Sequence, residues 1–462
     1  MAAAGASAWL ALGVLVVATI VGAVDRQLLV LLAEPLKHSL GLSDTQLGLL
    51  QGAGITLFAG LAAFPLGWLA DRYDRRVVLA GCVLLWSAST AACGLARDFP
   101  QMLLAASGLG LGEAGLVPIV YSLIPDLFPR GRRAAANALY AIAAVFGAGI
   151  GLWSSSLLLS WADAWARKSP ELFGGLEGWR VAFLLAACLG PVVAPGVALL
   201  RIRRRGDDCA ADARAEEAQR AGGAGGDVGD GVGDGDAGRA RPRHPLSAAP
   251  ALLPYLRRHA RALAGIFGGV GAASLGMSAV VTWLPVVAVR HFHASVTEAG
   301  QAVGLGFAAG TLIGGIFSAL QSRLHARFGA TAWVRSLGIS VGLAGVAAIA
   351  MPAMDSLGAI SALFSLLVAA TFAGAVIYAN LIQLVTPPQI RSRVLAINAA
   401  VTAIASAISP VAVGALSDRL PVDRQALLLA VALVAACALL PGAFIVLRNE
   451  RSIVRSVQEV GG

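Results

Sequence analysis

Twelve long runs of predominantly apolar residues constrain this chain more than any other feature of its sequence. A helix needs roughly 20 such residues to cross the hydrocarbon core of a bilayer, and each run is long enough to do so. The sequence therefore predicts an all-α polytopic membrane protein with 12 transmembrane helices. The runs are expected at about 9–34, 46–70, 77–96, 101–124, 134–160, 181–200, 261–289, 299–321, 333–353, 357–385, 392–416 and 425–447.

The composition of the 462-residue chain excludes an ordinary soluble enzyme. Apolar residues make up 57% of the chain and charged residues 13%, whereas soluble domains average about 45–50% and about 25%. An outer-membrane barrel is disfavoured because its strands alternate and keep a polar lumen. The net charge of +9 comes from Arg residues clustered between the apolar runs, which indicates control of membrane topology rather than nucleic-acid binding.

The cysteines and acidic residues indicate no cofactor and no metal site. Five cysteines, an odd number, are scattered without metal-ligand spacing, so neither a disulfide framework nor a zinc site is expected. The acidic residues between the sixth and seventh runs lack the loop pattern of a calcium site. The first run is too long for a cleaved signal peptide and carries charges in its interior, so we expect it to be retained as a helix.

A Gly- and Asp-rich stretch divides the apolar runs into two sets of six. Its sequence, AGGAGGDVGDGVGDGDAGRARPRHP, contains almost no large apolar side chain, so it cannot bury enough surface to offset the entropy of ordering. We expect residues 1–200 to form an N-terminal six-helix bundle and 201–256 a disordered cytoplasmic linker. Residues 257–462 should form a C-terminal six-helix bundle with a short cytoplasmic tail.

Lys and Arg concentrate in the loops on one side of the predicted helices, the side that also holds the linker. The positive-inside rule then places the linker and both termini in the cytoplasm, with the chain crossing a bacterial-type inner (plasma) membrane. Two six-helix halves joined by such a linker resemble the plan of the major facilitator fold, whose halves are related by an axis along the membrane normal. We expect a monomer that contacts membrane lipids and no nucleic acid.

Three charged residues remain inside the predicted helices, Asp25 and Arg26 in the first and Glu113 in the fourth. A charge at bilayer depth costs roughly 2.5–3.5 kcal/mol or more, so these groups should line a cavity or pair with one another. Two carboxylates beside one Arg fit a proton relay or a substrate contact, since protonation responds to burial and to nearby charge. The alternative is a structural pair in which Arg26 neutralises one carboxylate and fastens two helices. Adjacent residues point about 100° apart on a helix, so Asp25 and Arg26 cannot both face one cavity squarely.

The sequence GWLADRYDRR stands where the second predicted helix meets the following loop. It resembles the G-x-x-x-D-R-x-x-R-R signature of major facilitator transporters. Gly67 would permit close helix approach, and Asp71 would accept hydrogen bonds from Arg side chains or from the positive N-terminus of a neighbouring helix. We expect Gly67, Asp71, Arg72, Arg75 and Arg76 to form a conformational latch whose release lets the two bundles rock apart.

Several segments together resemble the spinster family of lipid transporters. They are VDRQLLVLLAEPLKHSLGLSDTQLGLLQG, GLGEAGLVP followed by LIPDLFPRGRRAAANALY, TWLPVVAVRHF, LVTPPQIRSRVLAI and GALSDR. The resemblance implies transport of lysolipids or sphingosine phosphate-type amphiphiles. It also implies that Asp25 and Glu113 are the protonatable pair and that Arg26 is a partner for a headgroup or a carboxylate. Members of the family usually carry an Arg where this chain has Ala106, so a phosphate contact would shift to Arg26.

The cavity candidates in the C-terminal half are neutral. They are Thr282, Trp283, Tyr378, Asn380 and Gln383. No carboxylate falls well inside a predicted C-terminal helix, so the charge of the cavity should lie in the N-terminal half. Such asymmetry suits an amphiphile whose headgroup meets Arg26 and whose tail lies against the C-terminal bundle. The alternative for each polar candidate is an interhelical hydrogen bond, worth about 0.6 kcal/mol.

We predict a secondary active transporter, not an enzyme, that moves an amphipathic anionic lipid-like substrate, of lysophospholipid or sphingolipid type, by proton-coupled alternating access. The alternative on the same fold is a proton-coupled organic-anion symporter or a small-molecule exporter. The anion:cation symporter branch shares the DR of the first helix, the SDTQ-G turn and the GEA of the fourth helix. A receptor is disfavoured because the sequence shows no folded soluble domain, and an enzyme because no nucleophile–base pair falls at bilayer depth.

Overall fold

The computed structural model describes residues 2–168, 171, 176–200, 249–387, 390–421 and 425–461. Within these ranges the regular elements are all helices. Twelve helical stretches in this part of the chain are long and apolar enough to cross a membrane, which confirms the predicted fold class. Most of their bounds lie within a few residues of the predicted runs, and the fifth span differs most because it continues to Lys168.

The N-terminal half contains six spans, three of which are assembled from shorter helices. The elements are α1 Ala2–Leu31, α2 Ala33–Leu40, α3 Asp44–Leu49, the π-helix η1 Leu50–Leu57, α4 Phe58–Arg72, α5 Arg75–Leu95, α6 Phe99–Glu113, α7 Leu116–Leu127, α8 Arg130–Lys168, α9 Gly178–Ala187 and α10 Leu189–Ala198. One span consists of α3, η1 and α4, another of α6 and α7, and a third of α9 and α10.

The C-terminal half contains six further spans and two short flanking helices. The elements are α12 Ala249–Arg258, α13 Ala260–Phe292, α14 Val296–Ala350, the 3-10 helix η3 Met351–Ala353, α15 Leu357–Val385, α16 Arg391–Ser417, α17 Ala426–Arg448 and α18 Glu450–Gly461. α14 contains two spans, because Gly329 adopts a φ of 68° and interrupts the helix.

The helix α12 occupies the last residues of the segment expected to be a disordered linker. Leu252, Tyr255 and Leu256 give this helix an apolar face that packs against the core, and that burial explains why the helix forms where a linker was expected. The remainder of the expected linker, residues 201–248, lies outside the described residues.

The fourth span breaks directly after Glu113, one of the three predicted intramembrane charges. Pro118 has no N–H to donate to the carbonyl group of Ala114, and the helix resumes at Leu116 as α7. The π-helix η1 lies against this span, and π-helical turns are frequent at functional sites. A Cβ atom on Gly110 would lie 2.3 Å from the carbonyl oxygen of Ile55, so only glycine permits this close approach of α6 to η1.

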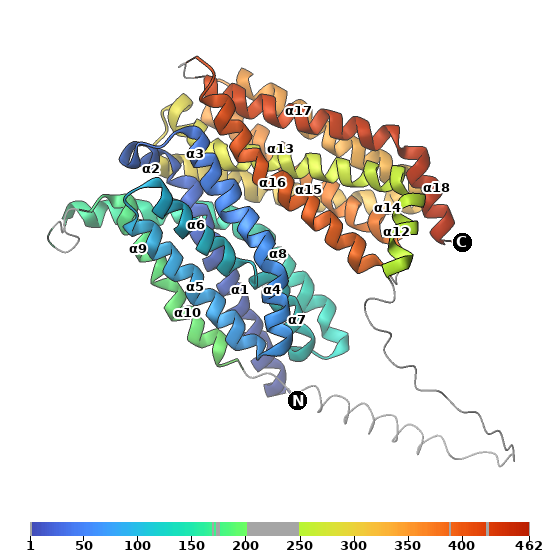
Figure 1. The fold of residues 1–462 in the computed structure, drawn as a ribbon, viewed down its shortest axis with the longest axis horizontal. Coiled ribbons are helices and arrows are strands. Elements are labelled where there is room, and N and C mark those ends of the chain that lie inside the picture. The colour runs from blue at the N-terminus through green and yellow to red at the C-terminus, as the bar shows by residue number, and fades with distance from the viewer. Residues whose placement is uncertain are drawn as a thin grey trace, which may run out of the picture.

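The two bundles meet at one end and diverge toward the other (Figure 1). At the meeting end, near α2, α3 and the C-terminal end of α16, backbone lies against backbone. A Cβ atom on Gly48 would lie 2.3 Å from the carbonyl oxygen of Pro410 in the opposite bundle. Gly149 of α8 and Gly304 of α14 approach each other in the same way. We call this the closed end, and the end that carries the N-terminus, α12 and α18 the open end.

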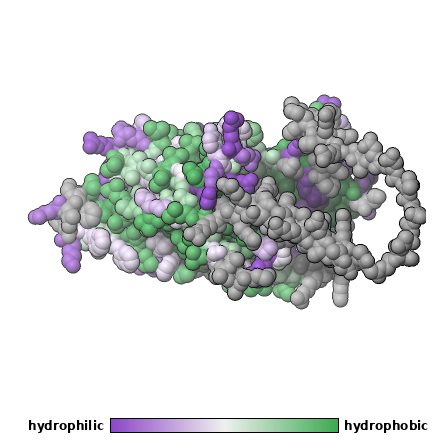
Figure 2. Space-filling view, turned by 90° about the horizontal axis from the view of Figure 1, so that it is seen from below, coloured by the Kyte–Doolittle hydropathy of each residue, from purple (hydrophilic) through white to green (hydrophobic). Residues whose placement is uncertain are grey.

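The described surface is largely apolar, as expected for a protein surrounded by lipid. Figure 2 shows hydrophobic side chains across much of the described part of the face it presents. Large exposed apolar side chains such as Phe64, Leu104 and Val192 belong to this surface. An exposed apolar area of this extent marks a membrane-contacting surface rather than a soluble one.

Candidate transport site and closed-end cluster

An ion pair between α1 and α6 unites two of the three intramembrane charges. The Nε atom of Arg26 donates to Oε2 of Glu113 at 2.6 Å, and the Nη2 atom donates to the same oxygen. The Glu113 side chain is 4% exposed, whereas that of Arg26 is 48% exposed. Oε1 of Glu113 is buried without a hydrogen-bond partner in the described structure. The guanidinium group is therefore the accessible part of this pair.

Asp25 lies on a different face of α1 and points into the N-terminal bundle. It is buried, and neither carboxylate oxygen has a hydrogen-bond partner among the described residues. Its neighbours are Trp86 and Thr90 of α5, and Glu113 is close enough to affect it electrostatically. The different burial of Asp25 and Arg26 follows from the 100° separation of adjacent helical residues, roughly as expected from the helical period.

Ala106, where the family resemblance led us to expect an Arg, is fully buried. A Cβ atom on Gly54 of η1 would lie 3.3 Å from the Cβ atom of Ala106. An Arg side chain at this position would force η1 away from α6. The close packing of these two spans therefore accounts for a small residue here, and Arg26 supplies the accessible cation on this side of the site.

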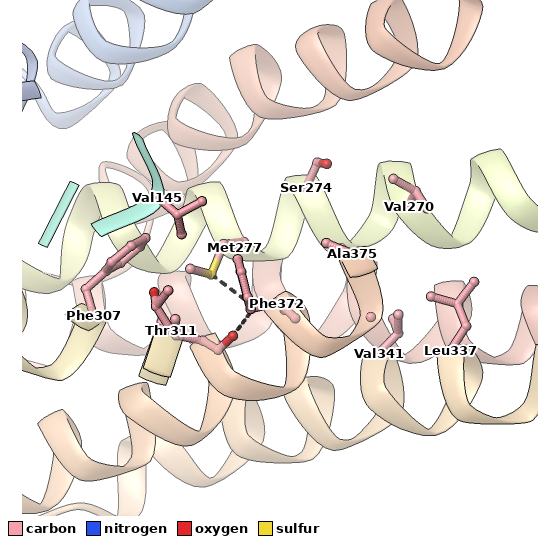
Figure 3. A pocket seen from close by; sticks show the side chains of 14 residues that line it. Val145, Val270, Ser274, Met277, Phe307, Thr311, Leu337, Val341, Phe372 and Ala375 are labelled. Carbon is pink, nitrogen blue, oxygen red and sulfur yellow. Dashed lines mark hydrogen bonds between the residues drawn. The ribbon is translucent and has the colours of Figure 1, made fainter. Parts of the chain in front are cut away.

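A pocket with an empty volume of about 700 Å³ lies in the C-terminal bundle. Its walls come from α13, α14 and α15, with Val145 contributed by α8 (Figure 3). The hydroxyl group of Thr371 donates to the carbonyl oxygen of Leu367 at 2.9 Å and lies 3.6 Å from Sδ of Met277. The hydroxyl group of Thr311 is buried without a partner in the described structure. The pocket is thus mostly apolar, and the hydroxyl-bearing residues among its described lining are Ser274, Thr311 and Thr371.

The three charged residues do not line this pocket. Among the described lining residues, none of Asp25, Arg26 and Glu113 occurs. Val145 stands two residues from Gly147 in α8, and a Cβ atom on Gly147 would lie 3.6 Å from Cβ of Ala23. Helix α8 thus faces the pocket through Val145 and faces α1 through Gly147, because residues two apart point about 200° apart on a helix.

The predicted cavity candidates of the C-terminal half divide into packing residues and more accessible ones. Trp283 is fully buried, and its Nε1 donates to the carbonyl oxygen of Pro410 at 3.1 Å, which fastens α13 to α16. Thr282 is also buried. The hydroxyl group of Tyr378 is buried without a partner among the described residues. Asn380 donates to the carbonyl oxygen of Val376 in its own helix, and Gln383 is exposed. None of the five is among the described residues that line the pocket.

A network of charged residues joins the two bundles at the closed end. Nε of Arg290 in α13 donates to Glu34 at 2.7 Å, and its two Nη atoms donate to the carboxylate oxygens of Asp44 at 2.8 Å. Lys37 and Ser417 also donate to Asp44, at 2.6 and 2.8 Å. Arg290 and Ser417 belong to the C-terminal bundle, so the nearly buried Asp44 is held from both sides of the interface.

Asp418, at the C-terminal end of α16, caps the N-terminus of α3 in the opposite bundle. Its carboxylate accepts from the backbone N–H groups of Asp44 at 3.1 Å and of Thr45 at 2.8 Å. It also accepts from the hydroxyl group of Thr45 at 2.7 Å. A carboxylate at this position satisfies free N–H groups and faces the positive end of the helix dipole. We call Glu34, Lys37, Asp44, Arg290, Ser417 and Asp418 the closed-end cluster.

The predicted latch lies toward the open end and contacts only its own bundle in the described structure. Asp71 is exposed, and Arg72 lies over the ring of Trp68 at 5.6 Å. Arg75 donates to the carbonyl oxygen of Ser122 and to Asp126, at 3.0 and 3.1 Å. Arg76 pairs with Asp74 and donates to the carbonyl oxygen of Leu200. A Cβ atom on Gly67 would meet nothing within 4 Å. The role of these residues as a latch stays a prediction.

Sequence reasoning missed the closed-end cluster, although a signal for part of it exists. The segments GWLADR, residues 67–72, and GALSDR, residues 414–419, share the pattern G-x-L-x-D-R. Each ends a helix, α4 in one bundle and α16 in the other. A Cβ atom on Gly414 would lie 2.2 Å from the carbonyl oxygen of Asp44. The repeated pattern could therefore have indicated an equivalent contact at each end of the interface.

Replacing Asp418 by Asn should lower the population of the conformation described here. A charge facing a helix dipole contributes about 0.3–1 kcal/mol, which corresponds to a roughly two- to fivefold change in the ratio of conformations. Pulsed EPR between spin labels at Tyr73 and Arg451, in a background with the native cysteines replaced, would measure it. Asp355→Asn, at an exposed turn, is the matched control. Identical distance distributions for the two variants would contradict the prediction.

The architecture defines the class of this protein. Two six-span bundles that touch at one end and diverge at the other, with intramembrane charges in one and an apolar pocket in the other, form a membrane transporter. Residues 14–410 match the family model of the Major Facilitator Superfamily. The chain belongs to this superfamily.

The chain is also similar to individual transporters. An MFS-type efflux pump of Mycolicibacterium smegmatis is 34% identical over 193 residues, which cover 42% of each chain. The sphingosine-1-phosphate transporter SPNS2 of Xenopus tropicalis is 30% identical over 167 residues, covering 35% of this chain and 32% of the relative. The matched segments thus span less than half the length of these relatives. A bacterial homologue of the human lysosomal transporter Spinster, inward-facing and unoccupied, superposes with a TM-score of 0.74 at 20% identity, covering 98% of this chain and 97% of that one.

Proposed function

We propose that this protein is a secondary active transporter that moves an amphipathic anionic substrate, of lysophospholipid or sphingolipid type, across the inner membrane by proton-coupled alternating access. The observation that supports this proposal is that the site is divided between the two bundles. The accessible guanidinium group of Arg26 lies on the N-terminal side, and an apolar pocket of about 700 Å³ lies on the C-terminal side. A single-chain amphiphile has a charged headgroup and an apolar tail that match these two surfaces.

The closed-end cluster supports alternating access. It seals one end of the interface with ion pairs and a helix cap, while the predicted latch residues at the other end contact only their own bundle in the described structure. The positive-inside rule assigns the open end, with the linker and both termini, to the cytoplasm. The conformation described here is then inward-facing. Opening to the other side requires the closed-end cluster to separate.

Asp25 and Glu113 are the proposed proton-binding groups. Asp25 is buried without a hydrogen-bond partner in the described structure, and an unpaired charge at bilayer depth is costly. When an anionic headgroup binds the guanidinium group of Arg26, Glu113 loses its ion pair with Arg26 and binds a proton instead. Binding of the substrate and binding of a proton would be linked through this exchange.

A small-molecule exporter is the second candidate function. The observation that favours it is the efflux pump of M. smegmatis, which has the higher identity of the two relatives described above. The apolar lining of this pocket is also typical of sites that bind small hydrophobic molecules. An organic-anion symporter is the third candidate function, and in it Arg26 would contact the anion.

Transport by the purified protein in liposomes tests the proposal. A labelled lysophospholipid is compared with small organic acids and a hydrophobic cation at several pH values, with a transmembrane pH difference imposed or abolished. We expect pH-dependent movement of the lysophospholipid. Movement of only the small acids, or of only the cation, would replace the lipid assignment by one of the alternatives.

Filling the pocket should remove the dependence of binding on tail length. Each buried CH₂ group contributes about 0.8 kcal/mol, so affinity should rise roughly fourfold per added carbon in the wild-type protein. Ala375→Trp places a large ring among the lining residues and should flatten this dependence for longer tails. Ala88→Trp, on an exposed face of α5, is the control. Competition by a series of lysophospholipids measures it, and an unchanged slope in Ala375→Trp would place the tail elsewhere.

A further inference from the structure

A basic cleft lies at the open end of the C-terminal bundle, away from the transport site. It is formed where α12 joins α13 and where α18 packs alongside, and its empty volume is about 770 Å³. Four Arg side chains line it, those of Arg257, Arg258, Arg261 and Arg455. The proposed transport mechanism uses none of them.

The walls of the cleft are fixed by contacts that hold the two flanking helices. The hydroxyl group of Tyr255 in α12 donates to the carbonyl oxygen of Val385 at 2.6 Å. Nδ1 of His259 and the hydroxyl group of Ser456 are 2.8 Å apart and join α12–α13 to α18. Ile453 of α18 is fully buried in the core. These contacts hold α12 and α18 against the bundle, so the walls of the cleft are fixed in place.

The charge in the cleft is largely uncompensated. Arg258 pairs with Glu459 at 3.2 Å, whereas Arg257, Arg261 and Arg455 form no ion pair within the described part of the chain. The side chain of His259 is 7% exposed, and its Nε2 lies 4.0 Å from Glu459, beyond hydrogen-bond distance. Glu459 is the single acidic residue among the described lining residues. The cleft thus offers several donors to an anion.

The position of the cleft decides which anion can reach it. The span of α13 begins at Ala260 and that of α17 ends at Arg448, so the cleft lies at the boundary between hydrocarbon and water. Leu253 stands one helical turn before Arg257 and is exposed, which places apolar surface beside the basic groups. Arg and Lys clusters at this boundary attract the headgroups of anionic lipids.

We propose that this cleft binds the phosphodiester headgroup of an anionic membrane phospholipid, of the phosphatidylglycerol type. Arg side chains donate to phosphate oxygens in paired geometry. The exposed Leu253 contacts the upper part of an acyl chain. A bound lipid would brace α12 and α18 against the bundle.

Native mass spectrometry of the full-length protein in detergent tests the proposal. The probes are dioctanoyl phosphatidylglycerol, the phosphatidylcholine of equal chain length, and glycerol 3-phosphate. We expect phosphatidylglycerol to bind at least about tenfold more tightly than phosphatidylcholine. The reason is that each Arg side chain near an anionic headgroup contributes to its binding. The variant Arg257→Gln, Arg261→Gln, Arg455→Gln should lose that preference. Equal binding of both lipids to the wild-type protein would overturn the proposal.

Two controls test whether the lipid preference arises in this cleft. Arg97→Gln, Arg132→Gln, Arg167→Gln removes three exposed charges elsewhere and should keep the preference; its loss would mean a non-specific charge effect. Arg26→Gln should impair transport of an anionic amphiphile but keep the lipid preference. Loss of the preference in Arg26→Gln alone would place the lipid in the transport site. Binding of glycerol 3-phosphate as tight as that of the lipid would mean a site for free phosphate and would also overturn the proposal.

Discussion

Replacing Glu113 by Gln is expected to abolish or uncouple proton-dependent transport while leaving expression intact. The substitution keeps the shape of the side chain but removes the charge that pairs with Arg26. A hydrogen bond to a charged group contributes about 1.5–3 kcal/mol, so we expect transport to fall by about tenfold or more. Uptake into liposomes at several pH values measures it. Glu171→Gln, an exposed loop carboxylate, is the control.

A charge-swapped variant separates a transport role of this pair from a structural one. Arg26→Glu combined with Glu113→Arg preserves an ion pair between α1 and α6, but it moves the cation from the half-exposed position to the buried one. If the pair only fastened the two helices, the swap would restore the transport that Glu113→Gln loses. We expect no restoration. Wild-type uptake with unchanged pH dependence in Glu113→Gln would remove Glu113 from the mechanism.

The helices and their approximate ends could be predicted from the sequence because they follow from length and hydropathy alone. A run of about 20 apolar residues bounded by charges has one stable solution in a bilayer, a helix whose backbone groups are satisfied internally. The last span, expected at 425–447, is Ala426–Arg448 in the structure. The rarity of charge inside the runs likewise identified Asp25, Arg26 and Glu113 as unusual. In the structure Arg26 and Glu113 form an ion pair, whereas Asp25 is buried on a different face of α1.

The rotation of each helix about its axis could not be predicted. Lipid tails are as apolar as Leu side chains, so a helix face against lipid and a face against protein carry similar residues. This explains why Trp283, a cavity candidate in the sequence, packs against α16 at Pro410 instead. It also explains why the pocket walls of α13, α14 and α15 gave no signal, since residues such as Val341 and Phe372 would suit either environment.

The closed-end cluster was missed for a different reason. Glu34, Asp44 and Arg290 stand at the ends of predicted helices, where charged residues are common and require no explanation. Their association depends on which helices of the two bundles are neighbours. The pattern shared by residues 67–72 and 414–419 carries that information only once α3 and α16 are known to be adjacent across the interface.

Replacing Gly48 by Leu is expected to prevent the closed end from forming and so to trap the transporter open at that end. A Cβ atom at this position would lie 2.3 Å from a carbonyl oxygen of the opposite bundle, and backbone cannot move aside as a side chain can. Overpacking of this kind costs typically 1–3 kcal/mol, so the ratio of conformations should change by about 5-fold to 160-fold. Spin labels at Tyr73 and Arg451 should come closer together, and transport should stop.

Replacing Gly67 by Leu is the matching substitution at the other end of the interface, and we expect it to trap the transporter in the opposite conformation. A Cβ atom on Gly67 meets nothing within 4 Å in the conformation described here, so the variant should fold and keep the distance between those labels. Because Asp418 caps α3 at the closed end, the equivalent position of Asp71 at the end of α4 predicts a cap on the N-terminus of α16 when the open end closes. Leu at position 67 would block that closure, and transport should stop with the labels far apart.

Gly81→Leu, on an exposed and uncrowded face of α5, should transport normally. Normal transport by both Gly48→Leu and Gly67→Leu would show that neither G-x-L-x-D-R segment acts in the cycle through close contact of the bundles.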